Sequence, residues 1–85
     1  MVQKYVLFTT PTCVACPAVK KYLDELEIKG LLKGEKIDVA SEQGYDKAVN
    51  YNVMRSPTVI FLDSNNKEMA RANNVSEIKS IVYDY

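Results

Sequence analysis

Cys13 and Cys16 are the residues of this sequence best suited to chemistry. They lie three positions apart, and on the first turn of a helix this spacing places both side chains on the same side. There they can close a small disulfide ring or stay as a pair of thiols. The sequence has no His, so a reaction must do without the commonest general base. The pair therefore predicts thiol–disulfide chemistry.

A helix predicted from Cys16 onward would activate Cys13 without a His. The N-terminus of a helix carries unpaired N–H groups and about half a positive charge, which stabilise a thiolate over a thiol. Cys16 shares the apolar helix face of Val19 and Leu23 and should be buried, whereas Cys13 ends a loop and should be exposed. We expect Cys13 to attack a substrate disulfide and Cys16 to resolve the mixed disulfide.

The cysteine pair also fits other uses. A zinc site needs four ligands, and two Cys without any His could supply them only from two copies of the chain. An inert structural disulfide would close a ring too small to stabilise the fold much. A redox sensor on a non-catalytic binding module is the main alternative to an enzyme. We predict that no cofactor and no metal is bound.

The composition predicts an ordinary folded domain. The 85 residues are 47% hydrophobic and 26% charged, which is typical of one globular domain spanning residues 1–85. Eleven basic and eleven acidic residues leave a formal charge of +0, so neither nucleic acid nor a membrane surface is an expected partner. The first apolar run, residues 5–8, is too short for a signal sequence or a membrane span. We expect a cytoplasmic protein.

Short apolar or alternating segments separated by turn residues predict four strands, at residues 5–9, 35–40, 58–62 and 67–72. The segment at residues 58–62 is apolar on both faces and should be a central strand. The segment after it can return as an antiparallel strand, because turn formers separate the two.

Three helices are predicted between and after these strands. Apolar residues at helical spacing follow Cys16 until Gly30 stops the pattern, and a shorter helix is expected at residues 45–51. The last helix should begin with Ser76 as its N-cap. The order βαβαββα gives an α/β domain with a four-stranded mixed sheet flanked by three helices, since parallel strands need helical crossovers and a hairpin adds an antiparallel edge.

Two motifs give nearly the whole chain a resemblance to a known family. Residues 7–16 form a strand followed by Pro-x-Cys-x-x-Cys at the start of a helix. Residues 55–58, Arg-Ser-Pro-Thr, are similar to that family's cis-proline signature before the third strand. On these motifs the chain resembles the thioredoxin superfamily, and most of all its short glutaredoxin-like members. The resemblance implies the thioredoxin fold and a dithiol–disulfide oxidoreductase that reduces protein disulfides.

The resemblance also assigns substrate-binding residues. In that family the cis-proline loop faces the CxxC turn, and the residue before the proline pairs its backbone with an extended substrate peptide. Substrate binding therefore falls to Ser56 and Pro57, joined by a cis bond, and to Thr12 beside Cys13. The implied partners are a disulfide-containing protein and an electron source, either a flavoprotein of the thioredoxin reductase type or glutathione. We expect a monomer.

Departures from the family pattern concern the subtype. Larger thioredoxins carry a Trp before the first Cys, and a buried acid in the first strand that assists proton transfer. Here there is no Trp before Cys13 and no acid within residues 5–8. Glutathione-using members commonly have a Lys where Thr10 stands and Gly-Gly where Asn73 and Asn74 stand, so glutathione binding should be weaker. The dipeptide Val14-Ala15 is similar to that of small donors serving ribonucleotide reductase. It adds no cation beside the thiolate, which favours a reductant.

Overall fold

The computed structural model describes residues 3–84. Its elements follow the predicted βαβαββα order: β1 (Lys4–Thr9), α1 (Cys16–Ile28), β2 (Lys33–Asp38), α2 (Glu42–Asn50), β3 (Thr58–Leu62), β4 (Glu68–Ala72) and α3 (Val75–Asp84). None of the helices found in residues 3–84 is long and apolar enough to cross a membrane. The predicted domain of residues 1–85 includes residues 1, 2 and 85, which lie outside the described residues.

The four strands form one mixed sheet in the order β2-β1-β3-β4. The two inner strands are β1 and β3, which run antiparallel to each other, and β2 runs parallel to β1. The hairpin of β3 and β4 adds the antiparallel edge that the sequence predicts. Every residue of β3 is buried, as expected from a segment that is apolar on both faces.

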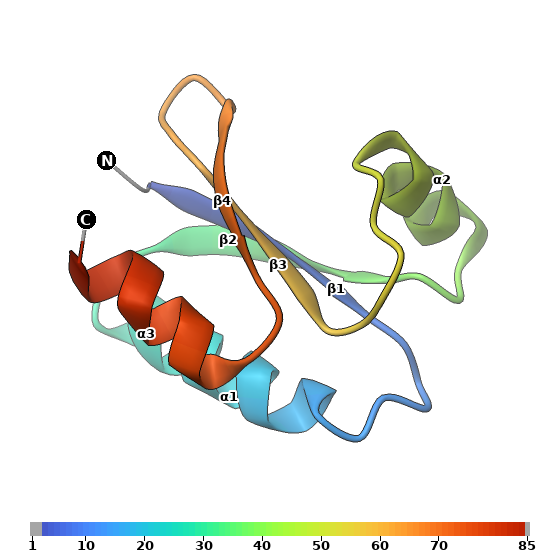
Figure 1. Ribbon diagram of the computed structural model, residues 1–85, viewed down its shortest axis with the longest axis horizontal. Coiled ribbons are helices and arrows are strands. Elements are labelled where there is room, and N and C mark those ends of the chain that lie inside the picture. The colour runs from blue at the N-terminus through green and yellow to red at the C-terminus, as the bar shows by residue number, and fades with distance from the viewer. Residues whose placement is uncertain (1–2, 85) are drawn as a thin grey trace.

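Helices cover both faces of the sheet, α1 and α3 on one side and α2 on the other (Figure 1). The side chains of β1 alternate between two cores, because successive residues of a strand point to opposite faces. Tyr5 and Leu7 pack with the buried face of α1, whereas Val6 and Phe8 pack with Ala48 of α2. Two cores therefore hold β1 from both sides, and β1 leads directly into the cysteine turn.

Some predicted boundaries are wrong by a few residues. The second strand begins at Lys33 and ends at Asp38, two residues before the predicted limits, because it pairs with all of β1 from Lys4 to Thr9. The second helix begins three residues earlier than predicted, at Glu42, since the side chain of Ser41 accepts a hydrogen bond from the Gly44 N–H and caps it.

Ser76 does not cap the last helix, contrary to the prediction. The helix begins at Val75, and the side chain of Asn74 accepts a hydrogen bond from the Glu77 N–H at 2.8 Å. Asn74 is therefore the N-cap, because the capping side chain must precede the helix and reach the third residue within it. Both Asn and Ser are good caps, so residue type alone does not separate the two positions.

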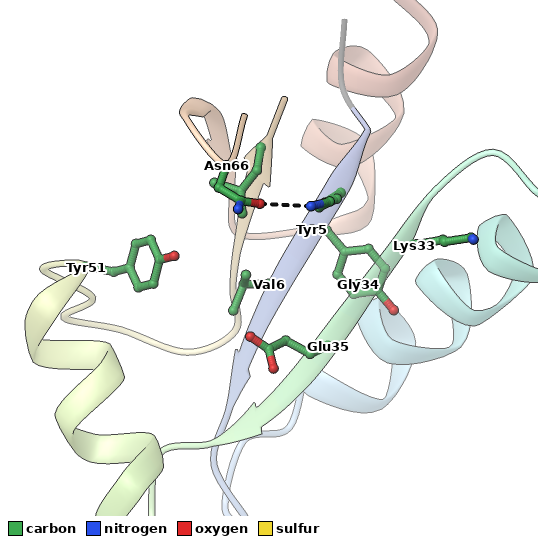
Figure 2. A pocket seen from close by; sticks show the side chains of 9 residues that line it. Tyr5, Val6, Lys33, Gly34, Glu35, Tyr51 and Asn66 are labelled. Carbon is green, nitrogen blue, oxygen red and sulfur yellow. Dashed lines mark hydrogen bonds between the residues drawn. The ribbon is translucent and has the colours of Figure 1, made fainter. Parts of the chain in front are cut away.

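A hollow of about 450 Å³ lies beside the beginning of β1 and β2, on the face that α2 covers. Tyr51, at the end of α2, faces Val6 of β1 across it (Figure 2). Lys4, Lys33 and Glu35 add charged groups to its wall. Since Cys13 follows the opposite end of β1, this hollow is separate from the cysteine turn.

Candidate active site

Cys13 and Cys16 form a disulfide in the turn between β1 and α1, with their Cα atoms 5.4 Å apart. The turn is closed by the Cys13 N–H, which donates to the Thr10 carbonyl at 3.2 Å. The helix begins at Cys16 with Pro17 in its first turn, a favoured place for a residue that lacks an N–H. The Cys16 N–H points at the Cys13 sulfur, 3.1 Å away, so Cys13 lies at the positive end of the helix.

The two sulfurs have different surroundings. Cys16 is 6% exposed and shares the buried face of α1 with Val19, Leu23 and Leu26, as predicted. Cys13 lies outside the helix and is partly exposed, less than the open position expected from the sequence, because the turn folds back on the end of β1. An attacking partner can therefore reach Cys13, while Cys16 is shielded by the protein.

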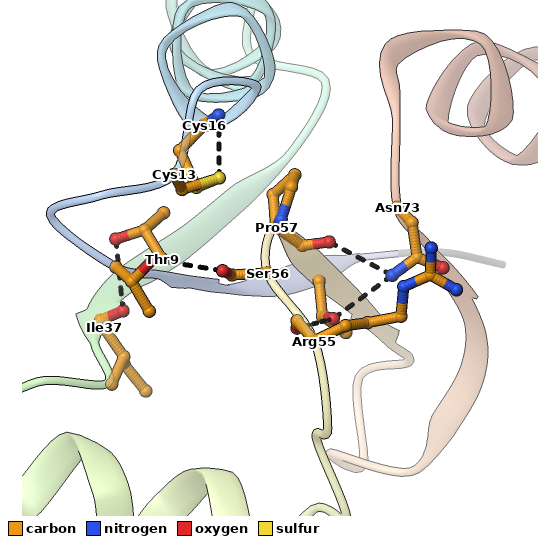
Figure 3. The surroundings of a disulfide bond; sticks show 10 residues. Thr9, Cys13, Cys16, Ile37, Arg55, Ser56, Pro57 and Asn73 are labelled. Carbon is orange, nitrogen blue, oxygen red and sulfur yellow. Dashed lines mark hydrogen bonds between the residues drawn. A yellow bond between two sulfur atoms is a disulfide. The ribbon is translucent and has the colours of Figure 1, made fainter.

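The loop before β3 lies beside this turn, because β1 and β3 are paired there and Phe8 is opposite Thr58. The Ser56–Pro57 peptide bond is cis, as the family resemblance implies. The hydroxyls of Ser56 and Thr10 are 3.1 Å apart, within hydrogen-bond distance, and this contact joins the proline loop to the cysteine turn (Figure 3). Two segments more than forty residues apart thus form one site at one end of the sheet.

Side chains from β3 and from the turn after β4 hold the proline loop on its other side. The Thr58 hydroxyl donates to the Arg55 carbonyl at 2.6 Å. The Asn73 carboxamide donates to the Pro57 carbonyl at 3.1 Å and to the Thr58 hydroxyl at 3.2 Å (Figure 3). Pro57 and Thr58 are buried, so these bonds satisfy polar groups that water does not reach freely.

Arg71 of β4 holds the start of the same loop in place through hydrogen bonds. Its guanidinium donates to the backbone carbonyls of Tyr51 and Asn52, which follow α2. Glu68 holds the other side of that guanidinium, with Nε 2.6 Å from a carboxylate oxygen, and this hydrogen bond raises the pKa of Arg71. The same contact lowers the pKa of Glu68. The loop is therefore fixed at both ends by β4 and the turn that follows it.

The remaining predicted residue, Thr12, lies exposed in the turn next to Cys13. In the sequence, Thr10 and Asn73 stand out only as departures from a family pattern, and nothing indicates a role for Arg71. Asn at position 73 was a usable signal, because its side chain can donate two N–H groups to a neighbouring loop, whereas Gly has no side-chain donor. In residues 3–84, no three His, Cys, Asp or Glu side chains are grouped as metal ligands would be.

Charged groups gather at the other end of the α1 face. The Tyr5 hydroxyl donates to Glu27 near the end of α1, and the Lys36 ammonium donates to that hydroxyl at 3.2 Å. Lys36 also lies 2.6 Å from a carboxylate oxygen of Asp24. Burial raises the pKa of Tyr5 to about 12, and the hydrogen bond to Glu27 acts in the same direction. The hydrogen bond to Asp24 raises the pKa of Lys36.

Comparisons with known proteins agree with this site. Residues 5–66 match the glutaredoxin family model, a span that includes the cysteine turn and the proline loop. Over 59 residues the chain is 36% identical to a thioredoxin of Methanocaldococcus jannaschii, covering 67% of each chain.

Solved structures that resemble this one include thioredoxins. Thioredoxin 1 of Thermosipho africanus superposes with a TM-score of 0.75 at 27% identity, covering 98% of this chain and 93% of that one. Oxidised thioredoxin O2 of Arabidopsis thaliana has a TM-score of 0.84 at 21% identity, covering 98% of this chain and 74% of that one, and shows the shared fold. The chain belongs to the thioredoxin superfamily as a glutaredoxin-like protein, and it is a thiol–disulfide oxidoreductase.

Proposed function

We propose that this protein is a reductant of protein disulfides, with Cys13 as the nucleophile and Cys16 as the resolving thiol. The observation that carries the proposal is the unequal exposure of the two sulfurs. Cys13 is partly exposed and receives the Cys16 N–H, while Cys16 is 6% exposed. Only one of the two sulfurs can therefore meet a large substrate, and it is the one that the helix N-terminus stabilises as a thiolate.

The reaction consists of two exchanges. The Cys13 thiolate attacks one sulfur of a substrate disulfide, a bond forms between them, and the other substrate sulfur leaves as a thiolate that takes a proton from water. The Cys16 thiol then loses its proton to water and attacks the Cys13 sulfur, and the second substrate sulfur leaves as a thiolate that takes a proton from water. The substrate gains two electrons, and the protein ends with the Cys13–Cys16 disulfide seen in the structure.

The substrate surface comprises Ser56, Pro57 and Thr12, around the cysteine pair. The backbone of Ser56 would pair with an extended segment of the substrate, in the manner of added β-strands. Two apolar side chains support a protein as the substrate, since Val14 is 96% exposed and Met54 is 94% exposed. Both lie on the loops that carry the site, and exposed apolar groups of this kind are typical of protein-binding surfaces.

The direction of electron flow follows from the residues between the cysteines. Val14 and Ala15 add no positive charge beside Cys13, so the reduced pair is not stabilised enough to make a strong oxidant. We propose that the protein works as a monomer in the cytoplasm and takes electrons from a flavoprotein of the thioredoxin reductase type or from glutathione. Ribonucleotide reductase is one enzyme it could supply with electrons.

The midpoint potential of the Cys13–Cys16 couple tests this direction. The protein is equilibrated in buffers of defined glutathione ratio, and its free thiols are trapped and counted. A potential of about −200 to −270 mV, the range of glutaredoxins and thioredoxin, is expected of a reductant. A potential near about −120 mV, that of a strong oxidant, would overturn the proposal.

The electron source is tested separately with the oxidised protein. One reaction contains a thioredoxin reductase with its nicotinamide cofactor, and the other contains glutathione with glutathione reductase. Consumption of the nicotinamide cofactor is followed in each. Because Thr10 replaces the Lys that would pair with a glutathione carboxylate, we expect the flavoprotein to reduce the protein faster. Faster reduction by glutathione would contradict that expectation.

A further inference from the structure

Asn73 links three parts of the molecule through hydrogen bonds. It lies between β4 and α3, and its carboxamide donates to the Pro57 carbonyl and the Thr58 hydroxyl at 3.1 and 3.2 Å. Its own N–H donates to a carboxylate oxygen of Glu77 at 2.7 Å. One residue thus connects the first turn of α3 to the loop that carries the cis proline.

The first turn of α3 fixes the position of Asn73. Glu77 accepts the Asn73 N–H, while the N–H of Glu77 donates to the Asn74 side chain at 2.8 Å. Such reciprocal bonds at a helix start satisfy two N–H groups at once and hold the incoming chain at a set angle. The Asn73 carboxamide is therefore pre-positioned toward the proline loop.

We propose that Asn73 is a positioning residue of the exchange reaction, which holds the Ser56–Pro57 loop in the shape that pairs with a substrate backbone. The inference rests on the proposed function and specifies how the site holds a protein substrate. Asn73 bonds to the carbonyl of Pro57, directly after the Ser56 backbone that the substrate would use. Thr58, its second acceptor, in turn donates to the carbonyl of Arg55, so Asn73 acts on both sides of Ser56.

This role differs from a purely structural one in its dependence on the substrate. A small disulfide needs only the Cys13 sulfur, whereas a protein disulfide also needs the Ser56 backbone. If Asn73 acts by holding the loop, its loss slows reduction of a protein and leaves reduction of a small disulfide unchanged. If Asn73 only stabilises the fold, both substrates are affected alike, or neither is.

The test compares Asn73→Ala with the matched control Asn74→Ala. Each variant is fully reduced, freed of reductant and mixed with excess insulin or with 2-hydroxyethyl disulfide, and loss of the protein thiols is timed after acid quenching. For Asn73→Ala we expect the concentration of insulin at half-maximal rate to rise about three- to tenfold, the effect of losing about one hydrogen bond between the Ser56 backbone and the substrate. The rate for 2-hydroxyethyl disulfide should be unchanged.

The control variant removes a side chain of the same type one residue away. Asn74→Ala deletes the cap of α3, so its thermal midpoint should fall. It keeps the carboxamide at position 73, so the ratio of its rates with insulin and with 2-hydroxyethyl disulfide should equal that of the unaltered protein. Thr58→Val is a second, nearly isosteric variant that removes the hydroxyl acceptor of Asn73. It should change the same ratio in the same direction, and it decides the question if Asn73→Ala does not fold.

Two results would overturn the inference in distinguishable ways. Suppose that the unaltered protein reduces both substrates, and that folded Asn73→Ala, or Thr58→Val in its place, has an unchanged ratio of the insulin rate to the 2-hydroxyethyl disulfide rate. Asn73 then has no positioning role, and the proposed function stands. If the unaltered, fully reduced protein reduces neither substrate, the proposed function fails and the role of Asn73 fails with it.

Discussion

The two ends of the α1 face hold their side chains by different forces. At the cysteine end, the Cys16 N–H, the hydroxyls of Thr10 and Ser56 and the Asn73 carboxamide make neutral hydrogen bonds. At the other end, Tyr5 and Lys36 lie among carboxylates of α1. A carboxylate beside Cys13 would destabilise its thiolate by charge repulsion. Because the charged cluster lies at the other end, the backbone N–H and the helix dipole can stabilise the thiolate without that repulsion. Chemistry and charge-based stability are thus separated along one helix.

Removal of the nucleophile should have the largest effect on chemistry and little effect on the fold. We expect Cys13→Ser to lower the rate of insulin reduction at least about a thousandfold, because a hydroxyl is a far weaker nucleophile than a thiolate. The rate is measured by insulin turbidity with dithiothreitol as the electron donor. The thermal midpoint of the reduced variant should equal that of the reduced unaltered protein, and a large drop would contradict the separation of the two ends.

A substitution at the far end should have the converse effect. A Cβ atom at Gly34 would overlap the carbonyl oxygen and ring of Tyr5, so Gly34→Ala should lower the free energy of unfolding by about 2–4 kcal/mol. Urea unfolding measures it. Gly30→Ala is the matched control, because a Cβ there would lie within 4 Å of no atom beyond its neighbours in the chain. Its cost of about 1 kcal/mol would come only from the φ of +74°. Equal losses in the two variants would show that the close contact with Tyr5 is unimportant.

The hydroxyl of Tyr5 should matter for stability and for its pH dependence. Tyr5→Phe should cost about 1 kcal/mol at neutral pH, because Glu27 and Lys36 lose a hydrogen-bond partner. A tyrosine ionises near pH 10.0 in the unfolded chain, and near 12 at this position in the fold. Above pH 10 the unfolded state therefore binds fewer protons than the folded state, and stability falls as the pH rises.

Tyr5→Phe should consequently flatten the loss of stability between pH 10 and 12. One proton limits the difference in slope to about 1.4 kcal/mol per pH unit. Urea unfolding at several pH values across that window measures both slopes. Identical slopes would mean that the pKa of Tyr5 is the same in the folded and unfolded states.

An exposed ion pair should give the smallest effect. Lys47 of α2 and Glu35 of β2 lie 3.5 Å apart with about half of each side chain exposed. Lys47→Ala should change the free energy of unfolding by less than about 0.5 kcal/mol, since solvent screens such pairs. Insulin reduction should be unchanged. A larger loss of stability would show that this exposed pair also contributes to the stability of the fold.

The sequence predicts the strongly patterned elements best. The strand at residues 58–62 is predicted to the residue, because apolar side chains on both faces have few alternatives to a central strand. The second strand is displaced by two residues, because its charged sequence carries little pattern and its pairing with β1 decides its limits. Ser76 was mistaken for a cap that Asn74 provides, since both types cap helices well.

The cysteine pair and the cis proline could be predicted because each depends on a local motif. The contacts that hold these two motifs together could not be predicted, because they join residues far apart in the chain. Thr10 contacts Ser56, and Asn73 contacts Pro57. Their partners become neighbours only when β1, β3 and β4 are placed in one sheet. Arg71 was missed for the same reason, because nothing near it in sequence indicates the carbonyls that it binds.

The central claim is that Cys13 attacks the substrate and Cys16 releases it. Its most direct test mixes reduced Cys16→Ser with insulin and analyses the alkylated products by mass spectrometry under non-reducing conditions. A stable mixed disulfide between Cys13 and an insulin chain is expected, because the second exchange cannot occur. Reduced Cys13→Ser should give no such adduct, since Cys16 is buried. An adduct formed by Cys16 in Cys13→Ser, with none in Cys16→Ser, would show that Cys16 is the nucleophile.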